Sequence, residues 1–364
     1  MIISTSKENF VKEIQRIQSG MNVKPGSLPI LQNFLLETVE DGVVISFTDL
    51  EMSLRHFIPL SVSEQGSVTV PVKKFMEIIN NLGNNDKITI SSDEAHRIKI
   101  KSGNSQIKMA GTGKEDYSAI PDIDTSSLFS VPALKISEMI NATLFSASTE
   151  SDRQFLNGLL WKYKEGSFSM VATDGRRLAV KTVSGIKSQQ EFSVIVPSKI
   201  LNELTKFLKT SGLKEDASMQ VSVSSNQIGF IIGKTSFLSR LAEGTYPAYE
   251  QIIPQTHEHE AKADSEALLA VTKRASICTS DRTSKVIYTF NNGVLKVNSS
   301  SQNMNMEFED EIPVSYEGEE FQISFNPNFI MDILKNLPAG EVIMQFKTAT
   351  TPALIKTAAE ETPL

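Results

Sequence analysis

The chain repeats one pattern of residues three times. The clearest copies are Val70–Ile79, Val196–Leu204 and Phe325–Leu334, in which an apolar residue and a nearby proline lead into apolar residues at helical spacing. The first two copies begin 126 positions apart, and the second and third begin 129 apart. This period has the size of a small domain and exceeds that of solenoid repeats. The 364 residues therefore predict three like domains, which could form an arc that closes into a ring.

Each copy also contains a tight-turn signal between two alternating apolar runs. The signals are Asp41-Gly42, Glu165-Gly166 and Asn292-Gly293, and their glycines are 124 and 127 positions apart. Alternation on both sides of such a dipeptide predicts a β-hairpin. The expected strand pairs are 33–39 with 43–48, 156–163 with 167–173, and 286–290 with 294–298.

Two amphipathic helices are expected in each copy, one before the hairpin and one after it. The first helices are predicted at 7–18, 133–144 and 264–275, and the second at 72–82, 198–209 and 327–337. Pro71, Pro197 and Pro327 fit the starts of the second helices, where a missing N–H costs little.

Short strands should follow each second helix. They are expected at 87–91, 97–101 and 106–110, at 218–223, 227–232 and 235–241, and at 341–346 and 353–357. The third copy is thus one strand short of the other two. We predict an α+β fold with domains at 1–125, 126–256 and 257–364, separated by Pro-rich and polar stretches.

Composition points to a soluble protein of a reducing compartment. No apolar run approaches the ~20 residues of a membrane helix, and the N-terminal residues do not read as a signal peptide. Cys278 is the only cysteine, so no intrachain disulfide can form, and we expect a cytoplasmic location.

The net charge of −7 is unevenly distributed along the chain. The six predicted helices together carry +4, which leaves −11 for the remainder. If the helices share one face, that face is mildly basic and could attract phosphate backbones without reading bases. Lys-rich helix surfaces are also common without any such role.

Enzyme motifs are weak throughout the sequence. Gly111–Lys114 lacks the spacing of a phosphate loop, and His257–Glu260 places ligand-type residues in a polar linker without cysteine. Asp174 could act as a base, but no catalytic partner stands at a recognisable spacing. We expect no catalysis, no metal and no cofactor. A three-domain enzyme using Asp174, or a ring scaffold without DNA, are the alternatives.

Five motifs together resemble the family of bacterial DNA polymerase III beta subunits, the sliding clamps. They are Ser27–Asn33, Thr48–Met52, Val70–Phe75, Phe155–Gly158 and Ala172–Ala179, in the order and spacing of the family. The resemblance runs from about residue 1 to 357. It implies three clamp domains per chain and a head-to-tail homodimer that forms a six-domain ring, with helices lining the hole and antiparallel sheets outside. The ring would encircle duplex DNA and tether the replicative polymerase.

The resemblance also implies DNA-contacting residues at Lys24, Lys73, Arg153 and Lys199. Lys24 lies in a turn after the first helix, where it could equally be a solvated loop residue. Lys73 and Lys199 begin second helices. Arg153 follows Glu150, whose negative charge disfavours DNA contact at that loop.

A second implied function is the docking of short linear peptides from DNA polymerase III alpha subunit, the clamp loader, other polymerases and repair proteins. The matching positions form an apolar slot with a basic rim, suited to Leu or Phe anchors; they are Leu156, Thr173, Gly175, Arg176, Arg177, Leu178, Pro247 and Ile252. Without the resemblance, Leu156, Leu178 and Ile252 would read as core. Arg176 replaces a common histidine, and Gln251 a common basic residue.

The implied ring seam joins domain one to domain three of the neighbouring chain. Lys74 and Ile107 match one side of it, and Ile277 and Cys278 match the other, although core packing explains the apolar members equally well. The family usually ends in an apolar tail that completes the peptide slot, whereas this sequence ends Glu361-Thr362-Pro363-Leu364. We expect either a truncated sequence or an unusual terminus, and weaker peptide binding if the slot is incomplete.

Overall fold

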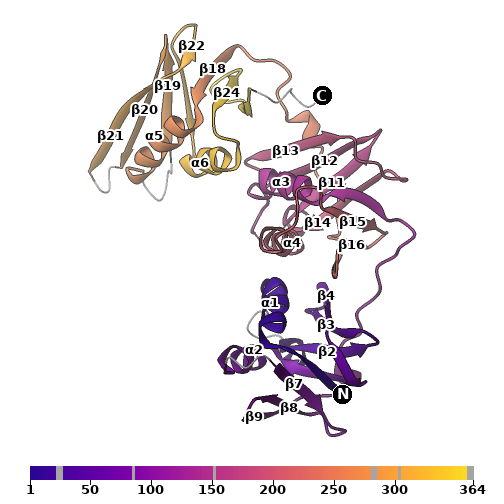
Figure 1. Ribbon diagram of the computed structural model, residues 1–364. Coiled ribbons are helices and arrows are strands. Elements are labelled where there is room, and N and C mark those ends of the chain that lie inside the picture. The colour runs from indigo at the N-terminus through magenta and orange to yellow at the C-terminus, as the bar shows by residue number, and fades with distance from the viewer. Residues whose placement is uncertain (22–27, 84–86, 151–152, 280–284, 302–304, 359–364) are drawn as a thin grey trace. The chain divides into compact units, whose positions relative to one another are not determined.

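The computed structural model describes residues 1–21, 28–83, 87–150, 153–279, 285–301 and 305–358 (Figure 1). The chain divides into two compact units. The first comprises Met1–Ile140, Ala147–Val171 and Lys181–Gly244, and the second comprises Asn141–Ser146, Ala172–Val180 and Thr245–Leu364. Within the described residues, no helix is long and apolar enough to cross a membrane.

The described residues of the first repeat form two α-helices and nine strands. The helices are α1 (Lys7–Ile17) and α2 (Val72–Asn81). The strands are β1 (Ile2–Ser6), β2 (Asn33–Val39), β3 (Gly42–Thr48), β4 (Met52–Pro59), β5 (Ser61–Glu64), β6 (Ser67–Pro71), β7 (Lys87–Ser92), β8 (Arg97–Ser102) and β9 (Ser105–Ala110).

The second repeat has the same plan. Its helices are α3 (Ala133–Leu144) and α4 (Ser198–Thr210). Its strands are β10 (Phe129–Pro132), β11 (Gly158–Lys164), β12 (Ser167–Thr173), β13 (Leu178–Ser184), β14 (Phe192–Pro197), β15 (Ser218–Val223), β16 (Gln227–Ile232) and β17 (Thr235–Arg240).

The third repeat lies in the second unit, where α5 and α6 pack side by side (Figure 1). The helices are α5 (Ser265–Ile277) and α6 (Pro327–Asn336). The strands are β18 (His259–Asp264), β19 (Val286–Asn291), β20 (Val294–Ser301), β21 (Met306–Pro313), β22 (Ser315–Tyr316), β23 (Phe321–Phe325), β24 (Glu341–Phe346) and β25 (Leu354–Thr357). In the described residues two strands follow α6, whereas three follow α2 and three follow α4.

Each repeat builds two antiparallel sheets, which confirms the expected α+β class. The sheet orders are β5-β1-β7-β8-β9, β13-β12-β11-β14, β22-β18-β24-β25 and β21-β20-β19-β23. The remaining sheet has eight strands in the order β10-β15-β16-β17-β4-β3-β2-β6. It crosses from the second repeat to the first because β17 pairs with β4, with Thr235 opposite His56. Sequence periodicity gave no sign of this junction.

All three predicted hairpins form, but their glycines serve different purposes. Glu165 and Gly166 both have positive φ, at 52° and 79°, as a two-residue turn with the twist of the flanking strands requires. Gly42 instead is the first residue of β3, and a Cβ there would lie 2.3 Å from the carbonyl oxygen of Ile58. Close approach of β4, and not turn geometry, therefore requires this glycine.

Aromatic side chains form the centre of each repeat. The rings of Phe10 and Phe34 meet Phe75 edge-on, with centroids 6.1 and 5.2 Å away, and so fix α1 and β2 against α2. Trp161 on β11 packs in the same way against Phe168 and Phe230. In the third repeat the buried Phe290 and Phe346 lie 5.1 Å apart. These contacts bury the apolar faces that the helical periodicity predicted.

Candidate functional site

The turn that joins β12 to β13 is held by its own side chains. Thr173 Oγ1 donates to the carbonyl of Arg177 over 2.7 Å and accepts from the N–H of Gly175 over 3.0 Å. Asp174 Oδ1 accepts from the N–H groups of Arg176 and Arg177, at 2.9 and 3.0 Å. Gly175 has φ +85°, a conformation that favours glycine. The turn therefore presents a rigid backbone without a side chain at its tip.

Arg177 is enclosed by four groups of the same unit. Its Nε donates to Asp174 Oδ2 over 3.0 Å, and one terminal nitrogen donates to Asp332 Oδ2 on α6 over 2.7 Å. The guanidinium also lies over the rings of Phe329 and Phe145, 4.8 and 5.7 Å from their centroids. Two carboxylates balance its single charge, so Arg177 has little capacity left for a ligand.

Among the other predicted slot residues, Arg176 and Leu178 lie in or next to this turn, and Pro247 and Ile252 lie in a later segment of the same unit. Arg176 is exposed and Leu178 is half-buried. The Tyr246 hydroxyl hydrogen-bonds the backbone of Thr173, and burial raises the pKa of Tyr246. This bond anchors the segment that contains the exposed Pro247. Ile252 is 53% exposed, so it is not a core residue. Leu156 belongs to the first unit, where it is buried.

The first repeat contains the same turn with different side chains. Thr48 Oγ1 donates to the carbonyl of Met52 and accepts from the N–H of Leu50, at 3.0 and 3.1 Å. Asp49 Oδ1 accepts from the N–H groups of Glu51 and Met52. Leu50 occupies the position of Gly175 and has φ +76°. The two turns have the same backbone conformation. At the tip, the first repeat has the side chain of Leu50, which is half-exposed, whereas the second repeat has Gly175 and no side chain.

Lys199 at the start of α4 binds this first turn. Its ammonium group pairs with Asp49 and, over 2.8 Å, with Glu51. Burial lowers the pKa of Lys199, but the hydrogen bonds to the two carboxylates outweigh it and leave the pKa above its usual value. Lys199 is therefore charged but largely neutralised by its neighbours.

The other predicted DNA-contacting residues differ in their surroundings. Lys73 on α2 and Arg153 are both exposed. Lys24 lies outside the described residues. Within the described residues, no hydrogen bond or ion pair joins Lys73, Arg153 and Lys199 to one another.

Of the predicted seam residues, Ile107 lies on one sheet edge, and Ile277 and Cys278 lie at the end of a helix that packs against another. β9 ends one sheet of the first unit and carries Ile107, which is half-buried, and Lys74 on α2 is exposed and paired with Glu77. β21 ends a sheet of the second unit and packs against α5, where Ile277 is 65% exposed and Cys278 is buried. Each edge exposes a row of unpaired backbone groups that can accept another strand.

The two edges carry opposite charges, a feature that sequence reasoning missed. Lys99, Lys101 and Lys108 share one face of β8 and β9, because Lys99 lies opposite Lys108 and alternates with Lys101. Crowding by Lys101 and Lys108, together with burial, lowers the pKa of Lys99. Glu307, Glu309 and Glu311 are exposed at alternate positions of β21. The alternation of glutamates with other residues in Met306–Pro313 is visible in the sequence and could have predicted an acidic strand face.

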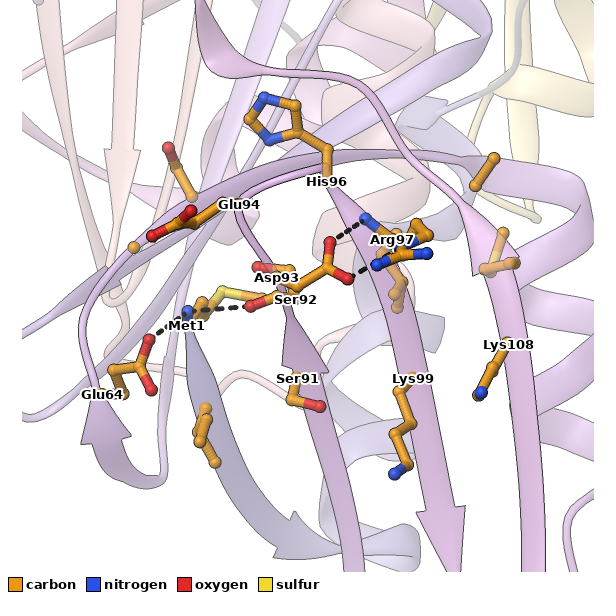
Figure 2. A pocket seen from close by; sticks show the side chains of 16 residues that line it. Met1, Glu64, Ser91, Ser92, Asp93, Glu94, His96, Arg97, Lys99 and Lys108 are labelled. Atoms are coloured by element: carbon orange, nitrogen blue, oxygen red, sulfur yellow. Dashed lines mark hydrogen bonds and ion pairs between the residues drawn. The ribbon is translucent and has the colours of Figure 1, made fainter.

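A depression of about 890 Å³ borders the lysine-bearing edge (Figure 2). The ammonium group of Met1 pairs with Glu64 over 3.2 Å, and Arg97 pairs with Asp93 over 2.8 Å. Figure 2 shows Lys99 and Lys108 on neighbouring strands of its wall. Neither lysine has a carboxylate partner in the part of the chain that the structure describes. The charges of Met1 and Arg97 are thus neutralised by their partners, and the wall formed by β8 and β9 is positively charged through Lys99 and Lys108.

The histidines and Asp174 have structural partners. His259 stacks on Phe321, with ring centroids 4.2 Å apart, and lies 2.9 Å from the Tyr316 hydroxyl. Both oxygens of Asp174 are engaged in the turn and with Arg177. Among the described residues, no group of three or more His, Cys, Asp and Glu side chains could hold a metal ion.

Comparison with known proteins covers the whole chain. Three family models match in succession: the N-terminal domain of DNA polymerase III beta subunit at residues 1–121, the central domain at 130–248 and the C-terminal domain at 250–363. The beta sliding clamp of Haemophilus influenzae is 32% identical over 357 residues, which are 98% of this chain and 96% of that protein. The beta sliding clamp of Escherichia coli is 29% identical over 362 residues, 99% and 97% of the two chains.

Solved structures give the same result. The DNA polymerase sliding clamp of Bacillus subtilis matches with a TM-score of 0.93 at 26% identity, over 99% of this chain and 96% of that one. The DNA polymerase III subunit beta of Pseudomonas aeruginosa matches with a TM-score of 0.92 at 28% identity, over 99% and 97%.

Proposed function

The chain belongs to the family of DNA polymerase III beta subunits, the bacterial sliding clamps, and from that premise we propose that it encircles duplex DNA and tethers the replicative polymerase. The observation that carries this proposal is the match of all three family domains, in order, to residues 1–121, 130–248 and 250–363. The family is non-catalytic, so the chain's contribution is topological. We place the domain boundaries near residues 125 and 256, and the protein in the cytoplasm with its DNA.

The proposed hold on DNA is weak and independent of sequence. The exposed Lys73 and Arg153 offer charge to the phosphate backbone, whereas Lys199 is already paired with two carboxylates. Lys24 remains a candidate contact. Few free cations suit a ring that must slide, because each fixed phosphate contact would slow movement along the duplex.

The proposed ring is a head-to-tail homodimer, and the chain contains a template for its seam. Inside the chain, β17 of the second repeat pairs with β4 of the first. Their counterparts, β9 of the first repeat and β21 of the third, are both sheet edges. The same pairing between two copies would use one free edge from each and close the ring after two contacts.

The template also gives a register for this seam. The registers of the equivalent hairpins show which positions correspond. Ser105 of β9 corresponds to Thr235 of β17, and Met306 of β21 corresponds to Met52 of β4. Transfer of the β4·β17 register places Lys108 opposite Glu307 and Ile107 opposite Phe308. One pair is complementary in charge and the other is apolar, which supports the proposal.

We further assign peptide docking to the turn at Thr173–Leu178 with Pro247, Ile252 and Leu156. Proposed ligands are extended segments with Leu or Phe anchors from the polymerase alpha subunit, the clamp loader, other polymerases and repair proteins. Gly175 leaves open the tip that Leu50 occupies in the first repeat, so only the second turn suits a ligand.

The experiment that tests the ring is retention on DNA. The chain is loaded onto nicked circular plasmid with a bacterial clamp loader and ATP, separated by gel filtration, and the plasmid is then linearised. Retention on circles and loss from linear DNA is expected, and a reaction without ATP is the control. Equal retention on both forms would mean ordinary electrostatic binding, and no retention on either would favour a scaffold without DNA.

A further inference from the structure

The two equivalent turns are both tied by ion pairs to the second helix of the following repeat. In the first unit Lys199, on α4, pairs with Asp49 and Glu51 of the first turn. In the second unit Asp332, on α6, pairs with Arg177 of the second turn. In the first case the helix supplies the base and the turn the acids, and in the second the helix supplies the acid and the turn the base. Both ion pairs nevertheless join equivalent elements of the repeats. An ion pair that joins the turn to the helix in both repeats, although acid and base are exchanged, indicates that holding the turn against the helix is itself important.

Resting on the proposed docking function, we propose that Asp332 is a positioning residue of the peptide site, acting through Arg177 on the turn that carries Gly175 and Arg176. It touches no ligand in this scheme. It fixes the guanidinium, which fixes Asp174, which in turn holds the two backbone N–H groups of the turn.

Each step of this chain of contacts has a defined geometry. Asp332 Oδ2 accepts from a terminal nitrogen of Arg177, and Asp174 Oδ2 accepts from Nε of the same guanidinium. Asp174 Oδ1 is left for the amides of Arg176 and Arg177. Because the guanidinium is planar and rigid, a shift of the terminal nitrogen that binds Asp332 also shifts the Nε that binds Asp174. The faces of Phe329 and Phe145 confine it further.

The arrangement divides the two arginines by role. Arg177 side-chain atoms are 16% exposed and satisfied by two carboxylates. Arg176 is exposed, and its orientation depends on a backbone that Asp174 holds. Arg176 is therefore free to meet a carboxylate of the peptide, while Arg177 and Asp332 keep the turn in place.

The test compares Asp332→Asn with a matched variant, Glu260→Gln. Glu260 pairs with His257 in the same unit, and its side chain is 37% exposed, as is that of Asp332. Amide hydrogen exchange is followed at residues 174–178. The affinity of each variant is then measured by fluorescence anisotropy with a labelled peptide bearing Leu and Phe anchors, selected from a display library against the unmodified chain.

We expect Asp332→Asn to speed exchange of the Arg176 and Arg177 amides and to weaken peptide binding about tenfold, with an unchanged melting temperature. Asp332→Glu should restore both, and Glu260→Gln should change neither. Wild-type exchange and affinity in Asp332→Asn would overturn the positioning role and leave docking intact. If the library yields no peptide that binds the unmodified chain, the docking proposal fails and this inference fails with it.

Discussion

His56 Nε2 lies 3.0 Å from Glu13 Oε2, in the interior of the first unit. The other ring nitrogen lies 2.8 Å from Thr235 Oγ1, so one buried imidazole connects α1, β4 and β17. Since β4 belongs to the first repeat and β17 to the second, His56 stands at the junction of the two repeats. Burial disfavours the charged imidazole and lowers its pKa, even though Glu13 acts in the opposite direction.

This lowered pKa predicts acid sensitivity of the first unit. The unfolded chain binds the proton at an ordinary pKa of about 6.5, whereas the folded chain takes it up only at lower pH. The free energy of unfolding should therefore fall as the pH drops below about 6.5, by at most about 1.4 kcal/mol per pH unit for one group. Urea unfolding from pH 7.5 to 5.5 measures it.

The contribution of His56 is isolated by His56→Gln, in which this part of the pH dependence should disappear. His96→Gln provides the control, because His96 is 36% exposed and meets Glu115 only at 3.5 Å. An unchanged pH profile in His56→Gln would show that other groups cause the acid sensitivity.

The turn of the first repeat predicts an inverted stability order at Leu50. A left-handed backbone costs an ordinary residue about 1–2 kcal/mol, whereas glycine adopts it freely. Leu50→Gly should therefore be more stable than Leu50→Ala by about 1 kcal/mol, although alanine is normally the better residue. Chemical denaturation of the two variants gives the difference directly, since both lose the same half-exposed side chain. Alanine as the more stable variant would contradict the left-handed assignment.

Local signals predicted the repeat elements well. The second helices, expected at 72–82, 198–209 and 327–337, span 72–81, 198–210 and 327–336. The hairpin at Glu165-Gly166 also formed as expected. Apolar periodicity and turn dipeptides suffice here because each depends on residues close together in the chain.

Contacts between distant residues could not be predicted in this way. Lys199 and Glu51 are 148 positions apart, and Arg177 and Asp332 are 155 apart. Neither ion pair produces a periodic pattern in the sequence. Lys199 was therefore predicted to be free to bind DNA, and Arg177 to bind a peptide. Only the fold brings their carboxylate partners to them.

The pairing of Lys199 predicts unequal effects of two lysines on DNA binding. Lys73→Ala should lower the salt dependence of binding to linear duplex by up to about 0.9 in log–log slope, the value for one phosphate contact. Lys199→Ala should change it much less, because Asp49 and Glu51 already neutralise the ammonium group. Fluorescence anisotropy across a salt series measures both, with the exposed Lys187→Ala as control. Equal slopes for Lys73→Ala and Lys199→Ala would mean that the ion pairs open on DNA.

The seam register predicts a charge-reversal experiment on the homodimer. Lys108→Glu or Glu307→Lys alone places like charges opposite each other at both seams of the ring. Each repelled pair costs about 1 kcal/mol, so the two seams together should raise the dimer dissociation constant about thirtyfold. The double variant Lys108→Glu/Glu307→Lys exchanges the charges within one chain and should restore the dimer. Analytical ultracentrifugation at low salt measures all three.

Glu317→Lys is the matched control, because Glu317 is an exposed glutamate of the same unit outside β21. It makes the same change of charge and should leave the dimer intact. The loss should also shrink at high salt, since exposed charges are screened there. A double variant as weak as either single one would show that Lys108 and Glu307 do not face each other, and that the β4·β17 pairing is not the template for the seam.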